Sequence, residues 1–367
     1  MRVLAQARKE LTQFLRDRLA LALALLLPVL LMLLMGSAIS LTPTDMPIGV
    51  RDYDNSEESR SLIEALNASL VFRVVEVPLD WSPERAFETK TVRAMAIIPE
   101  HFSRNLLRGS GAEVQAIVDA TDTNTATQVR GYFGQVVGAF AARWNGVQRQ
   151  GPVQLEIRLW YNPGRESRKF FGPGAFVFVL SIFPPLLAAL AMSKENELKT
   201  ITQVYVSSIT AAEYLLGKIA AYMAITAAAW VISLTVAVFV FGLRFAGDPT
   251  PFLAGSVFYL FASVSFGVMV GAAMPNQAVA VQAVAIGGFL SSFLLSGLIF
   301  PVQNIPEALR WVSYLVQARY FIEVSRDAFL QGGGWPAMSV PVLMIAVLGM
   351  FYFLVAWWNL RQMQVKA

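Results

Sequence analysis

The sequence contains no cysteine and one histidine among its 367 residues. Without cysteine there is no disulfide framework, no thiolate metal site and no lipoprotein anchor. The single histidine, His101, has no second imidazole with which to share a metal ion, so we interpret it as a surface residue at the start of a helix. We therefore expect no catalytic residue, no metal site and no cofactor-binding site on this chain.

Charge is also scarce in this sequence. Only 15% of the residues are charged, 56% are hydrophobic and the mean hydropathy is +0.53, whereas a soluble protein has about 25% charged residues. Six windows without Asp, Glu, Lys, Arg or His are long enough to cross a membrane as helices: 19–41, 170–192, 219–243, 251–274, 278–300 and 337–360. The composition predicts an α-helical polytopic membrane protein with six transmembrane helices.

The first window has an alternative interpretation as a signal peptide. A basic start precedes it, and the small residues Gly36, Ser37 and Ala38 lie near its end. The window is longer than a usual signal-peptide core, and five further windows already predict a membrane protein. We therefore expect the first window to be a transmembrane helix.

The basic residues flank the windows, which indicates a topological role and argues against a nucleic-acid partner. With the N-terminus inside, the cytoplasmic side receives Arg2, Arg8, Lys9, Arg16, Arg18, Lys194, Lys199, Lys218, Arg361 and Lys366. The short outer loops receive only Arg244, Arg310, Arg319 and Arg326. This bias predicts that both termini are cytoplasmic, with 361–367 as a short tail.

The segment 42–169, between the first two windows, has the composition of a soluble domain. Extended stretches at 47–54, 71–77, 92–99, 113–120 and 153–161 alternate with helical stretches at 56–67, 82–90, 100–108 and 124–149. Strands that alternate with helices predict a small α/β domain. The topology makes this inserted domain extracytoplasmic.

The first 18 residues precede the first window. Leu4, Ala7, Leu11 and Phe14 recur there at helical spacing, with charged residues elsewhere around the helix. This pattern predicts an amphipathic helix at the cytoplasmic interface of the membrane. The alternative is a positively charged start to the first span.

The windows lack the ionisable groups that a proton- or sodium-coupled carrier needs. The chain also lacks a G-x-x-x-x-G-K-[ST] motif for binding ATP phosphates. An ion-coupled carrier is therefore disfavoured, and any ATP-driven transport requires ATP and Mg²⁺ on another polypeptide.

Two features of the windows concern helix packing. Gly267 and Gly271 form a G-x-x-x-G pattern, which allows helices or subunits to approach closely. Pro184 and Pro185 predict a break near the middle of the second span, because each ring removes a backbone hydrogen bond.

Residues 301–336 are too apolar for a solvent-exposed loop and too often interrupted by proline for a span. They predict short re-entrant or interfacial helices in the outer leaflet. Trp335 on one side and Trp357 and Trp358 on the other bracket the last window at about 30 Å, as lipid-interface anchors do.

Four segments carry a resemblance to a known family: "LWYNPGRESRKFFGPG", "MSKENELKTITQ", "SGLIFPVQNIPEALRWVSYLVQARYFIEVSRDAFLQGG" and the N-terminal "ARKELTQFLRDR". Over essentially the whole chain, the sequence resembles permease subunits of bacterial ABC-2 type ABC transporters with a large extracytoplasmic domain. The resemblance implies an exporter in the bacterial inner membrane, built from two permeases, identical or paralogous, and two cytoplasmic ATPase subunits that bind ATP and Mg²⁺. Such permeases are often associated with a periplasmic membrane-fusion adaptor.

The second segment corresponds to the family pattern R-E-K-E-x-G-T-x-E-Q-L, which precedes the helix that docks on the ATPase. Within a cytoplasmic segment at 193–218, the resemblance assigns ATPase coupling to Lys194, Glu195, Glu197, Thr200 and Gln203. Lys199 stands where the family usually has glycine, and Thr202 stands where it usually has glutamate.

The residues of this segment also predict a helix by themselves. Leu198, Ile201 and Tyr205 fall on one helical face, and Glu195 and Lys199 form an i,i+4 charge pair.

In the third segment the resemblance indicates an outer gate or re-entrant element. Its residues are Ser296, Gly297, Phe300, Pro301, Asn304, Pro306, Arg319 and Tyr320.

The leading hypothesis is thus the permease subunit of an ATP-driven exporter. The second hypothesis is a membrane-anchored sensor or scaffold whose outer domain binds a partner. A stoichiometric ATPase that copurifies with the chain distinguishes the two.

Overall fold

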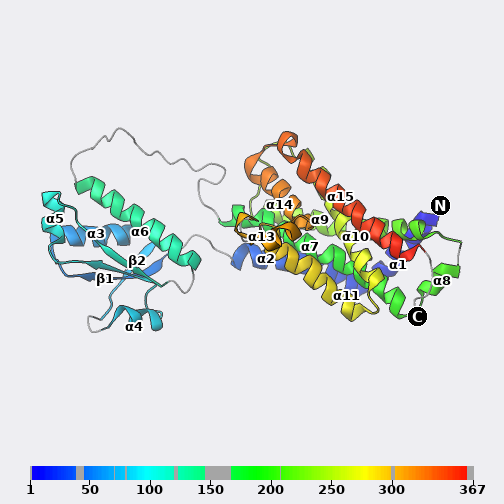
Figure 1. Ribbon diagram of the computed structural model, residues 1–367, viewed down its shortest axis with the longest axis horizontal. Coiled ribbons are helices and arrows are strands. Elements are labelled where there is room, and N and C mark those ends of the chain that lie inside the picture. The colour runs from blue at the N-terminus through cyan, green and yellow to red at the C-terminus, as the bar shows by residue number, and fades with distance from the viewer. Residues whose placement is uncertain are drawn as a thin grey trace. The chain divides into compact units, whose positions relative to one another are not determined.

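The computed structural model describes residues 2–38, 45–69, 71–78, 81–119, 123–144, 167–206, 208–298 and 302–361. The chain divides into two compact units, one formed by Leu41–Arg158 and the other by Met1–Ser40 together with Leu159–Ala367 (Figure 1). The predicted strand at 153–161 lies outside the described residues.

The smaller unit contains a four-stranded sheet. Its strands are β1 (Met46–Asp52), β2 (Phe72–Val75), β3 (Ala94–Ile98) and β4 (Gln115–Val118), in the order β2-β1-β3-β4. β1 pairs in parallel with β2 and β3, and β4 is antiparallel to β3. The helices are α3 (Glu57–Ala68), α4 (Pro83–Glu88), α5 (Phe102–Arg108) and α6 (Thr123–Trp144). The predicted alternation of strands and helices is therefore confirmed for the described part of this unit.

Local signals and alternating burial build this unit. The Ser82 side chain accepts a hydrogen bond from the Arg85 N–H at the start of α4, where Pro83 occupies the first turn. On one face of the sheet, Ile48 of β1 shares a core with Leu66 of α3. Met95 points to the opposite face, where it packs with α4.

The larger unit is helical. Its α-helices are α1 (Arg2–Arg16), α2 (Arg18–Ala38), α7 (Ser167–Glu197), α8 (Ile201–Val206), α9 (Ala211–Phe239), α10 (Thr250–Ala273), α11 (Gln277–Val284), α12 (Ser291–Leu295), α13 (Glu307–Ser313), α14 (Gln317–Arg326) and α15 (Trp335–Leu360). Between them lie the π-helical turns η1 (Ala285–Leu290) and η3 (Asp327–Gln331) and the 3-10 turn η2 (Val302–Asn304). α7 is the central helix, because it packs against α2, α9, α10, α11 and α14.

In the part of the chain that the structure describes, five helical segments are long and apolar enough to cross a membrane: Gly172–Glu197, Ala211–Phe239, Thr250–Ala273, Gln277–Leu295 and Trp335–Leu360. The number rises to six among the described residues if α1 and α2, which meet at an angle of 95°, are counted as one broken span. These helices agree with a polytopic membrane protein.

Two of the helices extend beyond the windows predicted for them. α7 continues to Glu197, and α9 begins at Ala211 instead of residue 219. The early start of α9 follows from a capping box, in which Thr210 accepts from the Glu213 N–H and Glu213 accepts from the Thr210 N–H. Several charges of the predicted cytoplasmic segment at 193–218 therefore belong to the long helices on either side of it, and Lys218 lies inside α9.

The predicted break at Pro184 and Pro185 is wrong, because α7 runs through both residues as one helix. α10 packs so closely here that a Cβ atom at Gly271 would lie 2.5 Å from the Ala189 carbonyl oxygen, and one at Gly267 would overlap the Pro185 carbonyl. Such contacts with neighbouring helices hold a proline-containing membrane helix in shape. The G-x-x-x-G pattern thus serves a contact within the chain.

The helical unit has two distinct ends. α1, α8 and the C-terminal end of α15 lie at one end, whereas α13 and α14 lie toward the other (Figure 1). The two groups of predicted site residues are therefore separated along the length of this unit.

Candidate functional site

The predicted coupling segment turns sharply at Lys199. α7 ends at Glu197, and the Leu198 and Lys199 N–H groups donate to the carbonyl oxygens of Lys194 and Asn196 at 3.0 and 3.1 Å. Lys199 has φ +55°, a left-handed conformation that favours glycine. The short helix α8 then begins at Ile201. The left-handed backbone at this position favours glycine. This explains why the family usually has glycine where this chain carries Lys199.

The prediction of one continuous helical face in this segment is wrong because of this turn. Leu198 is 61% exposed, whereas Ile201 is buried in the core shared by α1, α7 and α9. The side chain of Tyr205 lies outside the described residues.

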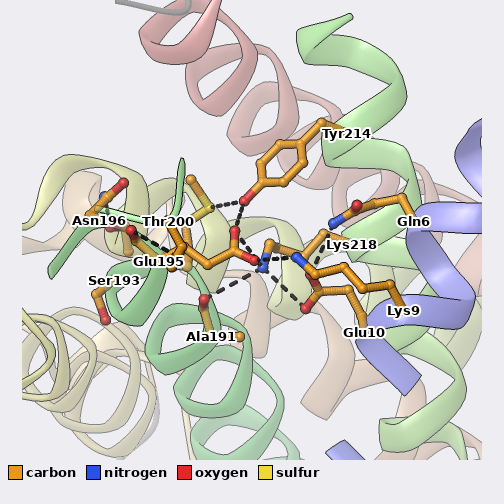
Figure 2. A network of polar contacts seen from close by, with 12 residues as sticks. Gln6, Lys9, Glu10, Ala191, Ser193, Glu195, Asn196, Thr200, Tyr214 and Lys218 are labelled. Atoms are coloured by element: carbon orange, nitrogen blue, oxygen red, sulfur yellow. Dashed lines mark hydrogen bonds and ion pairs between the residues drawn. The ribbon is translucent and has the colours of Figure 1, made fainter. Parts of the chain in front are cut away.

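A buried network of charges lies directly before this turn (Figure 2). Glu195 of α7 pairs with two lysines from other helices, Lys9 of α1 at 2.8 Å and Lys218 of α9 at 3.3 Å. Glu10 of α1 pairs with the same Lys218 at 3.1 Å. The Tyr214 hydroxyl donates to Glu195, and Lys218 also donates to the Ala191 carbonyl oxygen at 3.4 Å. Three segments that are distant in sequence are thus joined at one point.

The network is balanced in charge and mostly buried. The Lys218 side chain is 0% exposed and the Glu10 side chain is 3% exposed, while Lys9 is the half-exposed member. Two lysines and two glutamates compensate one another, which is the condition under which buried charges are tolerated. The predicted pair of Glu195 with Lys199 is wrong, because the left-handed turn ends the helix and Glu195 is directed to Lys9 and Lys218.

The remaining predicted coupling residues surround this network at the same end of the unit. Glu197 accepts hydrogen bonds from the backbone N–H and the side-chain amide of Gln277, the first residue of α11, both at 3.0 Å. The Thr200 hydroxyl donates to the Glu195 carbonyl oxygen at 3.4 Å. Lys194 and Gln203 are exposed. The structure therefore brings the predicted coupling residues together with the starts of α9 and α11.

A cavity of about 550 Å³ lies beside the network. Its walls come from α1, α2, α7, α8 and α9, and from Gln277. Charged residues such as Lys9 and Glu195 line one part of it, and apolar residues such as Phe14 and Leu187 line another. Among the residues that the structure describes, no group of three or more His, Asp or Glu side chains is arranged to hold a metal ion.

The sequence interpretation missed Glu10 and Lys218. Glu10 lies three residues after Ala7 and four before Phe14, so it belongs to the apolar face of the N-terminal helix. An acidic residue on an apolar helical face signals a buried partner. Lys218 gave a weaker signal, because it resembles a basic residue that flanks a span.

The predicted outer segment forms its own set of contacts at the other end of the unit. Ser296 is buried, and Gly297 has φ +85°. The Arg326 guanidinium donates to the carbonyl oxygens of Gly297 and Leu298 at 3.0 and 3.1 Å. Thus α14 holds the residues that directly follow α12.

The aromatic part of this segment is equally well defined. The Arg319 guanidinium stacks on Tyr314 at 4.1 Å from the ring centre and contacts the Ser313 hydroxyl. The Tyr320 hydroxyl donates to the Tyr314 carbonyl oxygen at 3.1 Å, and burial raises the pKa of this hydroxyl.

The predicted outer residues are only partly described. Asn304 ends η2 and Pro306 precedes α13. Phe300, Pro301 and the side chain of Asn304 lie outside the described residues. The structure therefore brings together Ser296, Gly297, Arg319 and Tyr320 as parts of one assembly around α14.

Comparison with known proteins now decides the family. The model of the ABC-2 family transporter protein matches residues 19–358. The chain belongs to the ABC-2 transporter family. The probable multidrug ABC transporter permease YbhS of Escherichia coli K12 is 26% identical over 360 residues, covering 97% of this chain and 96% of that protein.

Two further relatives of this ABC-2 chain come from the same organism. The probable multidrug ABC transporter permease YbhR is 28% identical over 349 residues, with 91% of this chain and 93% of that protein covered. The inner membrane transport permease YhhJ is 24% identical over 337 residues, with coverage of 89% and 88%. The resemblance found in the sequence motifs is confirmed: this is an ABC-2 chain whose relatives are transport permeases.

Proposed function

We propose that this ABC-2 chain is the permease subunit of an ATP-driven exporter in the bacterial inner membrane. Two permeases form the translocation path, and separate ATPase subunits dock on α8 and the turn before it. The smaller unit lies on the outer side of the membrane, and both termini lie in the cytoplasm. Family membership and the permease relatives support this proposal.

The observation that carries the coupling role is the anchoring of α7 immediately before the turn. Glu195 joins the end of α7 to α1 through Lys9 and to α9 through Lys218. A displacement of α8 by an ATPase would therefore be passed to three helices instead of being absorbed by a loose loop. Rigid, charge-paired connections are the kind of contact through which such coupling travels.

The exposed surface around α8 supports the docking of a protein at this end. Leu198, three residues before this six-residue helix, is 61% exposed, and Val206, its last residue, is 89% exposed. Large apolar side chains exposed at a helix end favour a protein partner. We therefore place the ATPase contact at Leu198, the turn at Lys199 and α8.

The test is copurification of an ATPase subunit from cells that express this chain. Leu198→Asp and Val206→Asp should reduce the amount of bound ATPase at least tenfold and leave the permease folded. The matched control is Leu107→Asp, because Leu107 is 65% exposed on α5 of the smaller unit. If the ATPase is retained by both variants, the docking surface is wrong. If the unchanged chain binds no ATPase, the exporter proposal fails.

The topology can be tested with single cysteines, because the chain has none of its own. Ser110→Cys in the smaller unit should react with an impermeant maleimide added to spheroplasts. Ser208→Cys, before α9, should react only after the membrane is opened; both serines are exposed. Labelling of Ser208→Cys from outside would overturn the orientation.

A further inference from the structure

α1 has three distinct sides instead of the two sides of a simple amphipathic helix. One side is buried against α9 and carries Gln6, Ala7, Glu10 and Phe14. This packing is tight, since a Cβ atom at Gly217 of α9 would lie 2.7 Å from the Gln6 Cβ atom. Ala7 and Phe14, which the sequence pattern placed on the membrane-facing side of this helix, therefore pack inside the protein instead.

The second side is apolar and uncovered. Leu4 is 74% exposed and Leu15 is 60% exposed. They lie eleven residues apart, which is about three helical turns, so both project from the same edge of α1. Two exposed leucines on one edge indicate an apolar environment on that edge.

The third side is basic. Arg8, Thr12 and Arg16 follow one another at four-residue spacing and are exposed, and Lys9 and Gln13 lie beside them along a shallow surface groove. Glu10, the one acidic residue within α1, is on the buried side, where Lys218 compensates it. The exposed surface of α1 thus carries positive charge without acidic residues of its own.

The bend between α1 and α2 determines how these sides face a membrane. The two helices meet at 95°, so if α2 enters a bilayer, α1 lies along the bilayer surface. α1 has 15 residues, which gives a length of about 22 Å along that surface. A helix lying in this way has one edge toward the acyl chains and the neighbouring side at the level of the headgroups.

We propose that α1 binds anionic phospholipid headgroups through Arg8 and Arg16, with Leu4 and Leu15 at the edge of the acyl-chain layer. Phosphate is the complementary ligand for a row of guanidinium groups. This inference rests on the proposed function in one respect only, namely that this end of the helical unit lies at a membrane surface. It does not require an ATPase, so it can fail or succeed independently of the exporter proposal.

The test uses the purified full chain without any partner. Native mass spectrometry in detergent measures the binding of phosphatidylglycerol and of phosphatidylcholine with the same acyl chains. The unchanged protein should prefer phosphatidylglycerol, and Arg8→Gln with Arg16→Gln should weaken that binding by about fivefold for each arginine. Binding of phosphatidylcholine should change little.

The matched control replaces Arg104 and Arg108 with glutamine. These are exposed arginines on α5 in the smaller unit, and their loss should leave the lipid preference intact. Leu4→Gln with Leu15→Gln should weaken the binding of both lipids alike, because it changes the apolar edge and retains the charges. Melting temperatures of all variants show that they are folded.

Two results would overturn the inference. Equal binding of the two lipids by the unchanged chain would show that the basic side does not select anionic headgroups. Retention of the preference by the Arg8→Gln and Arg16→Gln variant, together with loss of ATPase copurification, would assign the basic side to the ATPase instead. Inorganic phosphate added at millimolar concentration should compete only weakly, because it lacks the acyl chains that the leucine edge contacts.

Discussion

Replacement of Lys218 by methionine tests the central network most directly. Methionine has nearly the same length and fits an apolar site, so the substitution removes the charge without opening a large cavity. Lys218 lies 3.1 Å from Glu10 and 3.3 Å from Glu195. Glu195 retains Lys9 after the substitution, whereas Glu10 keeps only the longer contact with Lys9 at 3.6 Å and the hydrogen bond from the Gln6 amide at 2.9 Å.

The expected loss of stability is large. At an effective dielectric constant of about 20, each of the two Lys218 ion pairs represents a gross attraction of about 5 kcal/mol. Desolvation offsets much of this attraction in the intact network, whereas removal of one partner from a buried ion pair costs about 3–5 kcal/mol. We expect Lys218→Met to lower the free energy of unfolding by an amount toward the lower end of this range, because Lys9 and Gln6 still contact Glu10.

SDS titration of the protein in dodecyl maltoside, followed by tryptophan fluorescence, measures this change. Lys194→Met is the matched control, because Lys194 is exposed at the same end of the unit, and it should change the free energy of unfolding by less than about 0.5 kcal/mol. Glu10→Gln added to Lys218→Met should recover part of the loss, since it removes the buried carboxylate that has lost its nearer cation. A loss below about 1 kcal/mol for Lys218→Met would refute the reasoning that this network is a buried, compensated group of charges.

Three further predictions concern the backbone and pH. Lys199→Gly should raise the free energy of unfolding by about 1 kcal/mol, because it relieves the left-handed conformation, whereas Lys194→Gly inside α7 should lower it in the same SDS titration. Gly267→Ala should lower the free energy of unfolding by about 1–3 kcal/mol, since its Cβ would overlap the Pro185 carbonyl. Gly131→Ala is the control, because there is open space around Gly131, and it should be neutral or stabilising in thermal melts. The backbone N–H and hydroxyl of Thr250 donate to Asp248 and hold the pKa of its carboxyl below the usual value. This stabilisation is present above about pH 4 and is lost as pH falls through the lowered pKa. In Asp248→Asn, the free energy of unfolding should therefore fall less steeply as the pH is lowered below about 4. The same pH dependence in the variant and the unchanged chain would contradict this.

The sequence by itself determined the class of protein, a helical membrane protein, and those elements that depend on neighbouring residues alone. Long windows without charge predicted the membrane helices, because a helix in lipid must be apolar over most of its length. In the smaller unit, Ser82 and Pro83 predicted the start of α4, since a cap depends on only a few neighbouring residues. The family motifs also identified the segment at which α7 ends.

The tertiary structure alone decided how these elements are connected. Glu195 had a plausible partner four residues away in Lys199, yet it pairs with Lys9 and Lys218 from α1 and α9. Pro184 and Pro185 locally favour a break in α7, yet α7 is continuous through both residues, where α10 packs closely against it. In both cases the deciding contact comes from a segment distant in sequence. A local pattern describes what a residue prefers, but the partner that satisfies a buried charge or supports a proline is chosen only when the helices pack.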